Sequence, residues 1–256
     1  MAALISAYTG FVALSFLPPL VWLLFYLHED RHPEPKRLLV LTFAAGILAA
    51  GITVGVELAI FGAPSADTPN IPCGFVCLVA PTLLKFLPFV LTGIAIIEEV
   101  LKYAAVRFSV LKRPELDEPV DAMIYMLTAA LGFAAMENVL FLLPALHAGF
   151  LHGIELTASR FLGANLLHAL SSAIVGYALA RHLFSPWRRH AVFFGLLLAS
   201  ALHALFNYFI IIKDAVPGAL VLVILLLVLM TIMVFVDFER LKQRDSRLKA
   251  GATNTG

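Results

Sequence analysis

Long apolar runs dominate this chain and constrain what it can fold into. Each has about the 20 residues that an α-helix needs to cross roughly 30 Å of hydrocarbon. The composition agrees, since 61% of the residues are hydrophobic and only 14% are charged, against about 25% charged in a typical soluble domain. The sequence therefore predicts an all-α, polytopic transmembrane helical bundle of about seven spans. They fall near residues 3–27, 38–62, 88–108, 120–143, 158–181, 191–212 and 217–237.

The predicted spans account for nearly the whole chain. No polar block between them is long enough to fold separately, so we expect one transmembrane domain over residues 1–237 and a basic cytoplasmic tail over residues 238–256. The first apolar run lacks a basic start and a small-residue cleavage site, and it is too long for the apolar core of a signal peptide. We therefore expect it to be retained as a span.

Residues 73–87 do not fit this simple pattern. They are apolar, but Pro81 interrupts them, and proline suits the first turn of a helix better than its interior. We expect an interfacial or re-entrant helix here, on the outer side of the membrane. The alternative is one long kinked helix from about 73 to 110. The same stretch holds the only two cysteines, Cys73 and Cys77, and whether they form a disulfide does not follow from the sequence.

Basic side chains are concentrated in alternate connections between the predicted spans. The positive-inside rule places such connections in the cytoplasm, which puts the N-terminus outside and the C-terminus in the cytoplasm. The net formal charge of +1 gives no reason to expect a nucleic-acid partner, and the lipid bilayer is the expected environment. The basic residues concerned are Arg31, Lys36 and Arg37; Arg107, Lys112 and Arg113; Arg181, Arg188 and Arg189; and Arg240, Lys242, Arg244, Arg247 and Lys249.

Four predicted spans carry ionisable or amide side chains deep within their apolar stretch. Charge is poorly solvated by hydrocarbon, so such residues cost several kcal/mol unless they have a partner or a function. A helical rise of about 1.5 Å per residue places all of them between the middle of the bilayer and its outer leaflet. This shared depth predicts one site. Its members are Glu98, Glu99 and Lys102; Glu137 and Asn138; His168; and His203 with Asn207.

The residue types in this set indicate hydrolysis by an activated water molecule. A carboxylate in an apolar site becomes a stronger base, and no Ser-His-Asp arrangement is present to support covalent catalysis. Glu98 and Lys102 are four residues apart, so they are predicted to pair on one helical face. His203 and Asn207 have the same spacing, so they would lie on one face and can stabilise a developing oxyanion together.

A bound metal ion is the other means of activating water. His168 and His203, with either Glu99 or Glu137, would provide three ligands, and Glu98 would act as the base. The helical H-E-x-x-H motif of zinc proteases is absent, so the spacing alone does not establish zinc. Metal-free hydrolysis and hydrolysis with a divalent metal such as zinc both remain open at this point.

Other polar or small residues in the spans are interpreted as structural. Gly51 and Gly55 form a small-xxx-small pair, which typically allows close helix packing, and Glu57 follows directly on the same span. We assign Glu57 to packing or to the membrane interface. Arg160 is expected to reach the interface or to pair with Glu155 or a site carboxylate.

The same residues resemble the motifs of the PrsW family of intramembrane proteases, within the superfamily of type II CAAX prenyl endopeptidases and Abi proteins. The motifs occur in order over residues 30–207, and all of them together make the resemblance specific. They are D-R-x-x-P-E-P at Asp30–Pro35 in its approximate form, E-E-x-x-K at Glu98–Lys102, F-x-x-x-E-N at Phe133–Asn138, H-A-x-x-S at His168–Ser172, and H-x-x-x-N at His203–Asn207.

The resemblance implies a protease of a bacterial cytoplasmic membrane that cuts a membrane-protein substrate, expected to be single-span, near the extracytoplasmic face. It implies an anti-sigma-factor-like substrate in regulated proteolysis. Carried over by position, Glu98 is expected to be the base, with His168 assisting and His203 with Asn207 stabilising the oxyanion. Glu137 stands where CAAX endopeptidases carry a histidine, which makes prenylated substrates a poorer match. The resemblance leaves the choice between a glutamate-type and a metal-dependent enzyme open.

Two other classes of protein can carry buried ionisable groups in their spans. An ion- or proton-coupled transporter uses such residues as relays, although no internal repeat or pair of broken helices is visible here. A non-catalytic membrane scaffold or immunity protein is the third reading. Cleavage of reconstituted substrates separates these classes from a protease.

Overall fold

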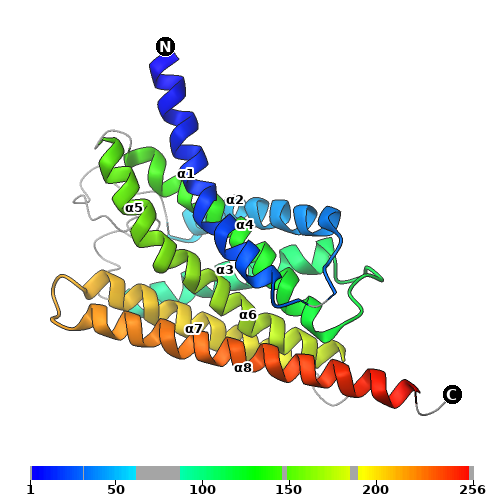
Figure 1. Cartoon of the computed structure of the whole chain (residues 1–256). Helices are drawn as coiled ribbons and strands as arrows, with labels where there is room; N and C mark the ends of the chain where they lie inside the picture. Colours follow the sequence, from blue (N-terminus) through cyan, green and yellow to red (C-terminus); the bar gives the residue numbers. More distant parts are fainter. Residues whose placement is uncertain (1, 31, 62–86, 146–148, 185–189, 254–256) are drawn as a thin grey trace.

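All regular structure in the computed structural model is α-helical over the part that it describes, residues 2–30, 32–61, 87–145, 149–184 and 190–253 (Figure 1). The predicted all-α class is confirmed. Both cysteines lie outside the described residues, as does the helix predicted at 73–87 except for residue 87. The helices are α1 (Ala2–Leu27), α2 (Lys36–Phe61), α3 (Leu87–Ser109), α4 (Pro119–Ala145), α5 (Phe150–Leu162), α6 (Ala164–Leu183), α7 (Ala191–Ile212) and α8 (Ala219–Thr253).

Six stretches of the described chain are long and apolar enough to cross a membrane. They are α1, α2, α4, α5 together with α6, α7 and α8. The remaining predicted span, residues 88–108, corresponds to α3, which carries Glu98, Glu99, Lys102 and Arg107 within 23 residues. This helix nevertheless packs inside the bundle against α2 and α7. Its crossing of the membrane stays a prediction.

The fifth predicted span, residues 158–181, is corrected by the structure. A break at Gly163 divides this region into α5 and α6, and α5 begins at Phe150, within what was expected to be an outer loop. The backbone at Gly163 has φ −100° and ψ −95°, and a Cβ there would lie 2.9 Å from the Ser159 carbonyl oxygen. Glycine suits the break because it has no Cβ and low helix propensity.

The C-terminal region also differs from the predicted tail. The helix α8 continues through residue 237 to Thr253, so the basic segment extends the last span as a helix. Figure 1 shows α8 running beyond the other helices at its C-terminal end. This tail carries several lysine and arginine residues, which have good helix propensity. The predicted span ends near 237 because it was drawn from apolarity alone.

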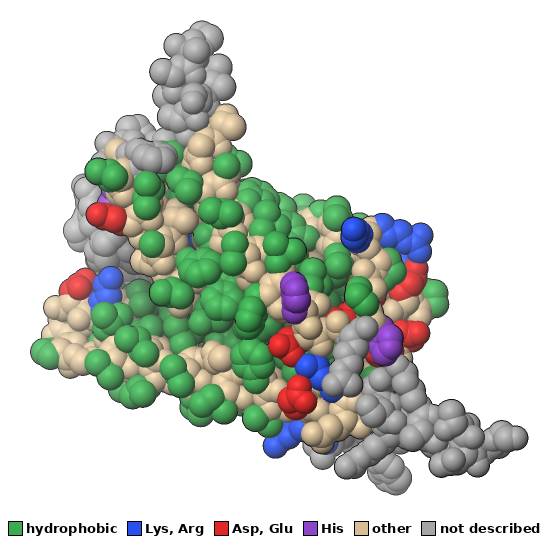
Figure 2. Space-filling model, viewed as in Figure 1, with side chains coloured by type: hydrophobic (Ala, Val, Ile, Leu, Met, Phe, Trp, Pro, Cys, Tyr) green, Lys and Arg blue, Asp and Glu red, His purple; other side chains and the backbone are tan. Residues whose placement is uncertain are grey.

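The helix α4 forms the centre of the bundle. It packs most extensively against α6, α2 and α1, and residues 122–131 are almost entirely buried. Such a helix is hydrophobic on all sides because it contacts other helices all round. The outer helices instead expose large apolar side chains, including Leu24, Val40 and Leu220, as a lipid-facing surface requires. In Figure 2 apolar side chains cover the middle of the visible face, and charged ones lie mostly toward its two ends.

Close approach of α2 to α4 depends on Gly46 and Gly132. A Cβ added at Gly46 would lie 2.0 Å from the Ala129 carbonyl oxygen, and one at Gly132 would lie 2.1 Å from the Phe43 carbonyl oxygen. The predicted packing role of Gly51 and Gly55 is wrong for the part of the chain that the structure describes, because a Cβ at either meets none of these residues within 4 Å. The small-residue pattern alone did not show which face of α2 meets α4.

We expect Gly46→Ala to destabilise the protein and Gly51→Ala to leave its stability unchanged. Both changes add one methyl group to α2, but only the first forces the backbones of α2 and α4 apart, at a cost of about 1–3 kcal/mol for overpacking. Thermal unfolding of the two variants in the same detergent measures the difference. Equal melting temperatures would contradict the packing described here.

Candidate active site

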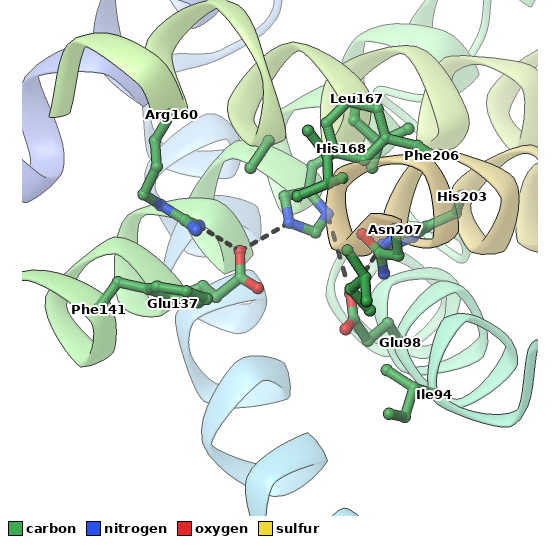
Figure 3. A pocket seen from close by; sticks show the side chains of 13 residues that line it. Ile94, Glu98, Glu137, Phe141, Arg160, Leu167, His168, His203, Phe206 and Asn207 are labelled. Atoms are coloured by element: carbon green, nitrogen blue, oxygen red, sulfur yellow. Dashed lines mark hydrogen bonds and ion pairs between the residues drawn. The ribbon is translucent and has the colours of Figure 1, made fainter. Parts of the chain in front are cut away.

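Most of the predicted site residues line one cavity of about 120 Å³ between α3, α4, α5, α6 and α7. In Figure 3 the side chains of Glu98, Glu137, His168 and His203 point toward one another, and Arg160 reaches in from α5. The remainder of the wall is largely apolar. The polar side chains that line the cavity are Glu98, Glu137, Arg160, His168, His203 and Asn207.

Glu99 does not line the cavity but lies behind it, fully buried. Its carboxylate accepts hydrogen bonds from Lys102 (2.8 Å), Ser171 (2.9 Å), Ser172 (3.2 Å) and His203 (2.9 Å). A carboxylate with this many donors holds its negative charge inside the bundle. Glu99 is therefore placed to orient other residues, and its oxygens are already engaged.

Lys102 connects α3 to α6 at the base of the site. Its ammonium is fully buried, donates to Glu99 and to His168 Nδ1 at 2.8 Å each, and lies 4.6 Å from the centre of the Phe133 ring. The predicted pairing with Glu98 is present only as a longer contact of 3.6 Å. The i, i+3 partner Glu99 is nearer because its side chain points into the bundle.

His168 is held by hydrogen bonds at both ring nitrogens. Because a lysine ammonium can only donate, Nδ1 must accept from Lys102, and the ring proton lies on Nε2. That Nε2–H donates to Glu137 Oε2 at 2.8 Å. The hydrogen-bond network thus assigns the neutral imidazole and fixes its orientation.

His203 has one nitrogen engaged and one directed at the cavity. Its Nδ1 lies 2.9 Å from Glu99 Oε1. The Glu99 carboxylate, which also accepts a hydrogen bond from Lys102, accepts the Nδ1 proton. The Nε2 lone pair then faces Glu98, whose Oε2 lies 3.7 Å away. The rings of His168 and His203 meet edge to face with centroids 5.1 Å apart.

Glu98 supplies the least satisfied atom of the site. Its side chain is 6% exposed, and its Oε2 has no hydrogen-bond partner among the described residues. Lys102 Nζ, His203 Nε2 and His168 Nδ1 surround this oxygen at 3.6, 3.7 and 3.9 Å. These distances are too long for hydrogen bonds, and an unpartnered buried oxygen is costly. A water molecule or a cation beside Glu98 Oε2 would supply the partner that this oxygen lacks.

Arg160 is a site residue that sequence reasoning placed only loosely. It donates to Glu137 Oε2 at 2.6 Å and to Asn138 Oδ1 at 2.5 Å, and it stacks 4.0 Å from the Phe141 ring centre. Asn138 in turn donates to Asn165 at 3.0 Å. The break at Gly163 turns α5 so that Arg160 faces α4, and no local pattern in the sequence indicated this.

Asn138 also links the site to α1. Its amide donates at 3.0 Å to the carbonyl oxygen of Ser15. That carbonyl has no helical partner of its own, because the residue four positions later is Pro19, which lacks an N–H. Asn138, which the sequence placed in the site, thus ties α4 to α1 and to α6.

Glu57 lies close to the site, although its sequence position suggested packing or the membrane interface. It lines a small cavity together with Glu98 and Glu137. Both of its carboxylate oxygens are buried without a hydrogen-bond partner in the described part of the chain. The signal that could have found it is its charge within an apolar span.

We expect Arg160→Met to lower both stability and activity. The change leaves the Glu137 carboxylate, whose side chain is 14% exposed, without its cation, and breaking such a buried pair costs about 3–5 kcal/mol. Adding Glu137→Gln to this variant should restore part of the stability, since it removes the stranded charge. Thermal unfolding of the two single variants and the double variant tests the coupling, and simple additivity would contradict it.

The whole chain was compared with known proteins. The model of the PrsW family, described as "PrsW family intramembrane metalloprotease", matches residues 34–236. This chain belongs to the PrsW family. Proteins named Protease PrsW from Geobacillus kaustophilus and Bacillus subtilis are 28% and 26% identical over 191 and 186 residues, which are 74% and 72% of this chain and 74% of each relative. No solved structure matches it.

Membership of the PrsW family makes this protein an integral membrane protease. It sets aside the transporter and scaffold readings. The cavity that holds Glu98 and the two histidines lies within the matched region. The wider placement with CAAX endopeptidases and Abi proteins rests on the motifs alone.

The PrsW family is described as a metalloprotease family, so the site residues must be able to bind a metal ion if this protein uses one. Glu98, His168 and His203 each offer one ligand atom, and these atoms lie within 4.8 Å of one another. Two imidazoles and one carboxylate are a donor set that zinc accepts. Glu98 Oε2 and His203 Nε2 are available, whereas His168 can bind a metal only if it releases Lys102 or Glu137.

This donor set differs from the expected one. Glu98 takes the ligand position that the sequence assigned to Glu99 or Glu137. Those two carboxylates instead accept hydrogen bonds from the ring nitrogens of His203 and His168. Carboxylates in that position orient a ligating imidazole and raise its basicity.

Proposed function

We propose that this protein is a metal-dependent endopeptidase that hydrolyses a peptide bond of a single-span membrane protein near the extracytoplasmic face. The observation that carries this proposal is the unpartnered oxygen of Glu98, buried opposite His203 Nε2. A water molecule placed between these two atoms would complete both of them. The face is inferred from the position of the site along the spans and from the positive-inside rule, and the single-span substrate is inferred from the motif resemblance.

In the proposed reaction Glu98 accepts a proton from the water whose oxygen attacks the substrate carbonyl carbon. Lys102, 3.6 Å from Glu98, balances the charge of the carboxylate before the transfer. Asn207, which lines the cavity, can donate a hydrogen bond to the developing oxyanion. The peptide C–N bond then breaks, and the proton on Glu98 passes to the leaving amine.

A divalent cation such as zinc would be held by one carboxylate oxygen of Glu98, by His168 and by His203, and the other oxygen of Glu98 would then accept the proton of the water. When bound, it supplies Lewis-acid chemistry that polarises a carbonyl and makes water a better nucleophile at neutral pH. Glu99 and Lys102 would keep His203 and the ligands in place through the hydrogen bonds already present.

Reconstitution with a panel of single-span substrates tests this proposal. We expect two product masses that place the cleaved bond in the outer half of the substrate span. Anti-sigma-factor-like proteins belong in the panel because the motif resemblance implies that substrate class. Cleavage mapped only to the cytoplasmic half would contradict the proposed face, and cleavage of soluble domains alone would contradict the substrate class.

A further inference from the structure

A second acidic group lies outside the active site, where the connection between α1 and α2 meets the start of α4. Asp30, Glu118 and Asp121 each offer one carboxylate oxygen, and these atoms lie within 4.8 Å of one another. Asp30 is 7% exposed and Asp121 is 1% exposed. Asp30 belongs to the sequence motif that begins at that residue, and the active site gives this motif no role.

Both aspartates have one satisfied oxygen and one unsatisfied oxygen. Asp30 Oδ1 accepts the His32 backbone N–H at 2.9 Å, and Asp121 Oδ2 accepts the N–H groups of Asp117 and Glu118 at 3.0 and 2.7 Å. Asp30 Oδ2 and Asp121 Oδ1 are buried, and neither has a hydrogen-bond donor as a partner among the described residues. The Asp121 carboxyl instead lies in hydrogen-bond contact with the Glu34 carboxyl. Two carboxyl groups in such contact need a proton or a cation between them, and the unpartnered Asp30 oxygen in the same cluster indicates a missing ligand.

The cluster also gathers several carboxyl groups in a small volume. Glu34 is buried at the same place and accepts a hydrogen bond from the Tyr125 hydroxyl. His32 Nδ1 lies 3.0 Å from Glu118, and the His32 side chain is 60% exposed. Burial raises the pKa of the Asp30 and Glu34 carboxyl groups above their usual range. The anionic forms are thus poorly stabilised by the chain alone.

We propose that Asp30, Glu118 and Asp121 form a binding site for a hard divalent cation of the Mg²⁺, Mn²⁺ and Ca²⁺ class. All three donors are carboxylate oxygens, which these ions prefer. The active site differs because it offers two imidazole nitrogens and one carboxylate. The two sites therefore select different metals, and one can be studied without the other.

An ion at this position would join two parts of the fold that are far apart in the sequence. Asp30 follows α1, whereas Asp121 lies in the first turn of α4. The ion would tie the α1–α2 connection to the central helix, which carries Glu137 and Asn138 further along. We expect its main effect to be on stability, because the cluster lies at the opposite end of α4 from those residues.

Titration of the full-length protein with Mn²⁺, followed by electron paramagnetic resonance, tests the proposal. The background is His203→Ala, which removes a ligand of the active site. We expect one Mn²⁺ bound per chain in this background and at least a tenfold weaker affinity after adding Asp121→Asn. Glu118→Gln provides a second, less buried variant, in case Asp121→Asn fails to fold. Asp214→Asn, an exposed acid in the α7–α8 connection, is the matched control and should bind Mn²⁺ unchanged.

Thermal unfolding gives a second readout that does not depend on activity. Mg²⁺ should raise the melting temperature of the parent and of Asp214→Asn, but not that of Asp121→Asn or Glu118→Gln. Absence of Mn²⁺ binding in the parent would overturn the proposal, as would unchanged binding in both acidic-site variants. Mn²⁺ binding that appears only in the Arg31→Gln variant would also overturn the proposal, because the Arg31 side chain would then neutralise the native cluster.

Discussion

Replacing Glu98 with glutamine is expected to abolish peptide-bond cleavage while leaving the fold intact. Glutamine has nearly the same shape, but it cannot accept a proton from water. Removing a general base lowers the rate by about 10²–10⁴-fold, and loss of a metal ligand on the same side chain would add to this. Because Glu98 Oε2 makes no hydrogen bond in the described structure, the change strands no partner, and the melting temperature should stay close to that of the parent.

The cleavage rate of a reconstituted single-span substrate measures this effect. Glu155→Gln is the matched control, since the Glu155 side chain is 80% exposed on α5. This variant should cleave the substrate at the parent rate. Glu99→Gln gives a useful contrast. It replaces a carboxylate that accepts four hydrogen bonds, so it should lower stability as well as activity. Parent-like cleavage by Glu98→Gln would sink the assignment of this residue as the base.

Removing the metal is expected to produce a comparable loss of activity. Chelation should abolish cleavage, and addition of Zn²⁺ should restore it, because Glu98, His168 and His203 form a two-nitrogen, one-oxygen donor set. His203→Ala should contain far less zinc than the parent, since His203 Nε2 is the nitrogen that faces Glu98. Metal analysis of purified protein, alongside cleavage assays, measures both quantities.

The control for this experiment is His152→Ala, which changes an exposed histidine on α5 and should retain the parent's zinc content. Full activity after exhaustive chelation, together with no zinc in the parent, would contradict the metal-dependent proposal. The glutamate mechanism would then stand on Glu98 and its neighbours alone. Hard cations such as Mg²⁺ should not replace zinc at this site, because imidazole nitrogen suits zinc better.

Much of the active site was predictable because its signal is local. A charged or amide side chain in an apolar helix is conspicuous in any sequence, and helical rise gives its depth. The predicted residues Glu98, Glu137, His168, His203 and Asn207 all line the cavity. The helical spacing rules were less useful for predicting ion-pair partners. They predicted that Lys102 pairs with Glu98, whereas the shortest carboxylate contact of Lys102 is with Glu99.

The features that sequence reasoning missed or left open depend on how helices are rotated against one another. A site carboxylate was one of several partners expected for Arg160, and the structure shows Glu137 as the partner. Arg160 enters the site because the helix is interrupted at Gly163. A single glycine in an apolar run does not by itself predict such an interruption. Gly46, and not Gly51 or Gly55, allows α2 to approach α4. These outcomes depend on which face of each helix is buried, and helices such as α2 and α4 are apolar on nearly every side.

The sequence by itself determined that this protein is a helical membrane bundle with a polar site inside it, because hydrocarbon admits only apolar surfaces and makes every buried charge informative. It also carried the motifs that identify the PrsW family. Only the tertiary structure decided the partners: Glu99 behind the site, Glu98 open to it, and Arg160 bound to Glu137. Hydrogen bonds form between atoms brought together from different helices, and their geometry follows from packing that no single segment specifies.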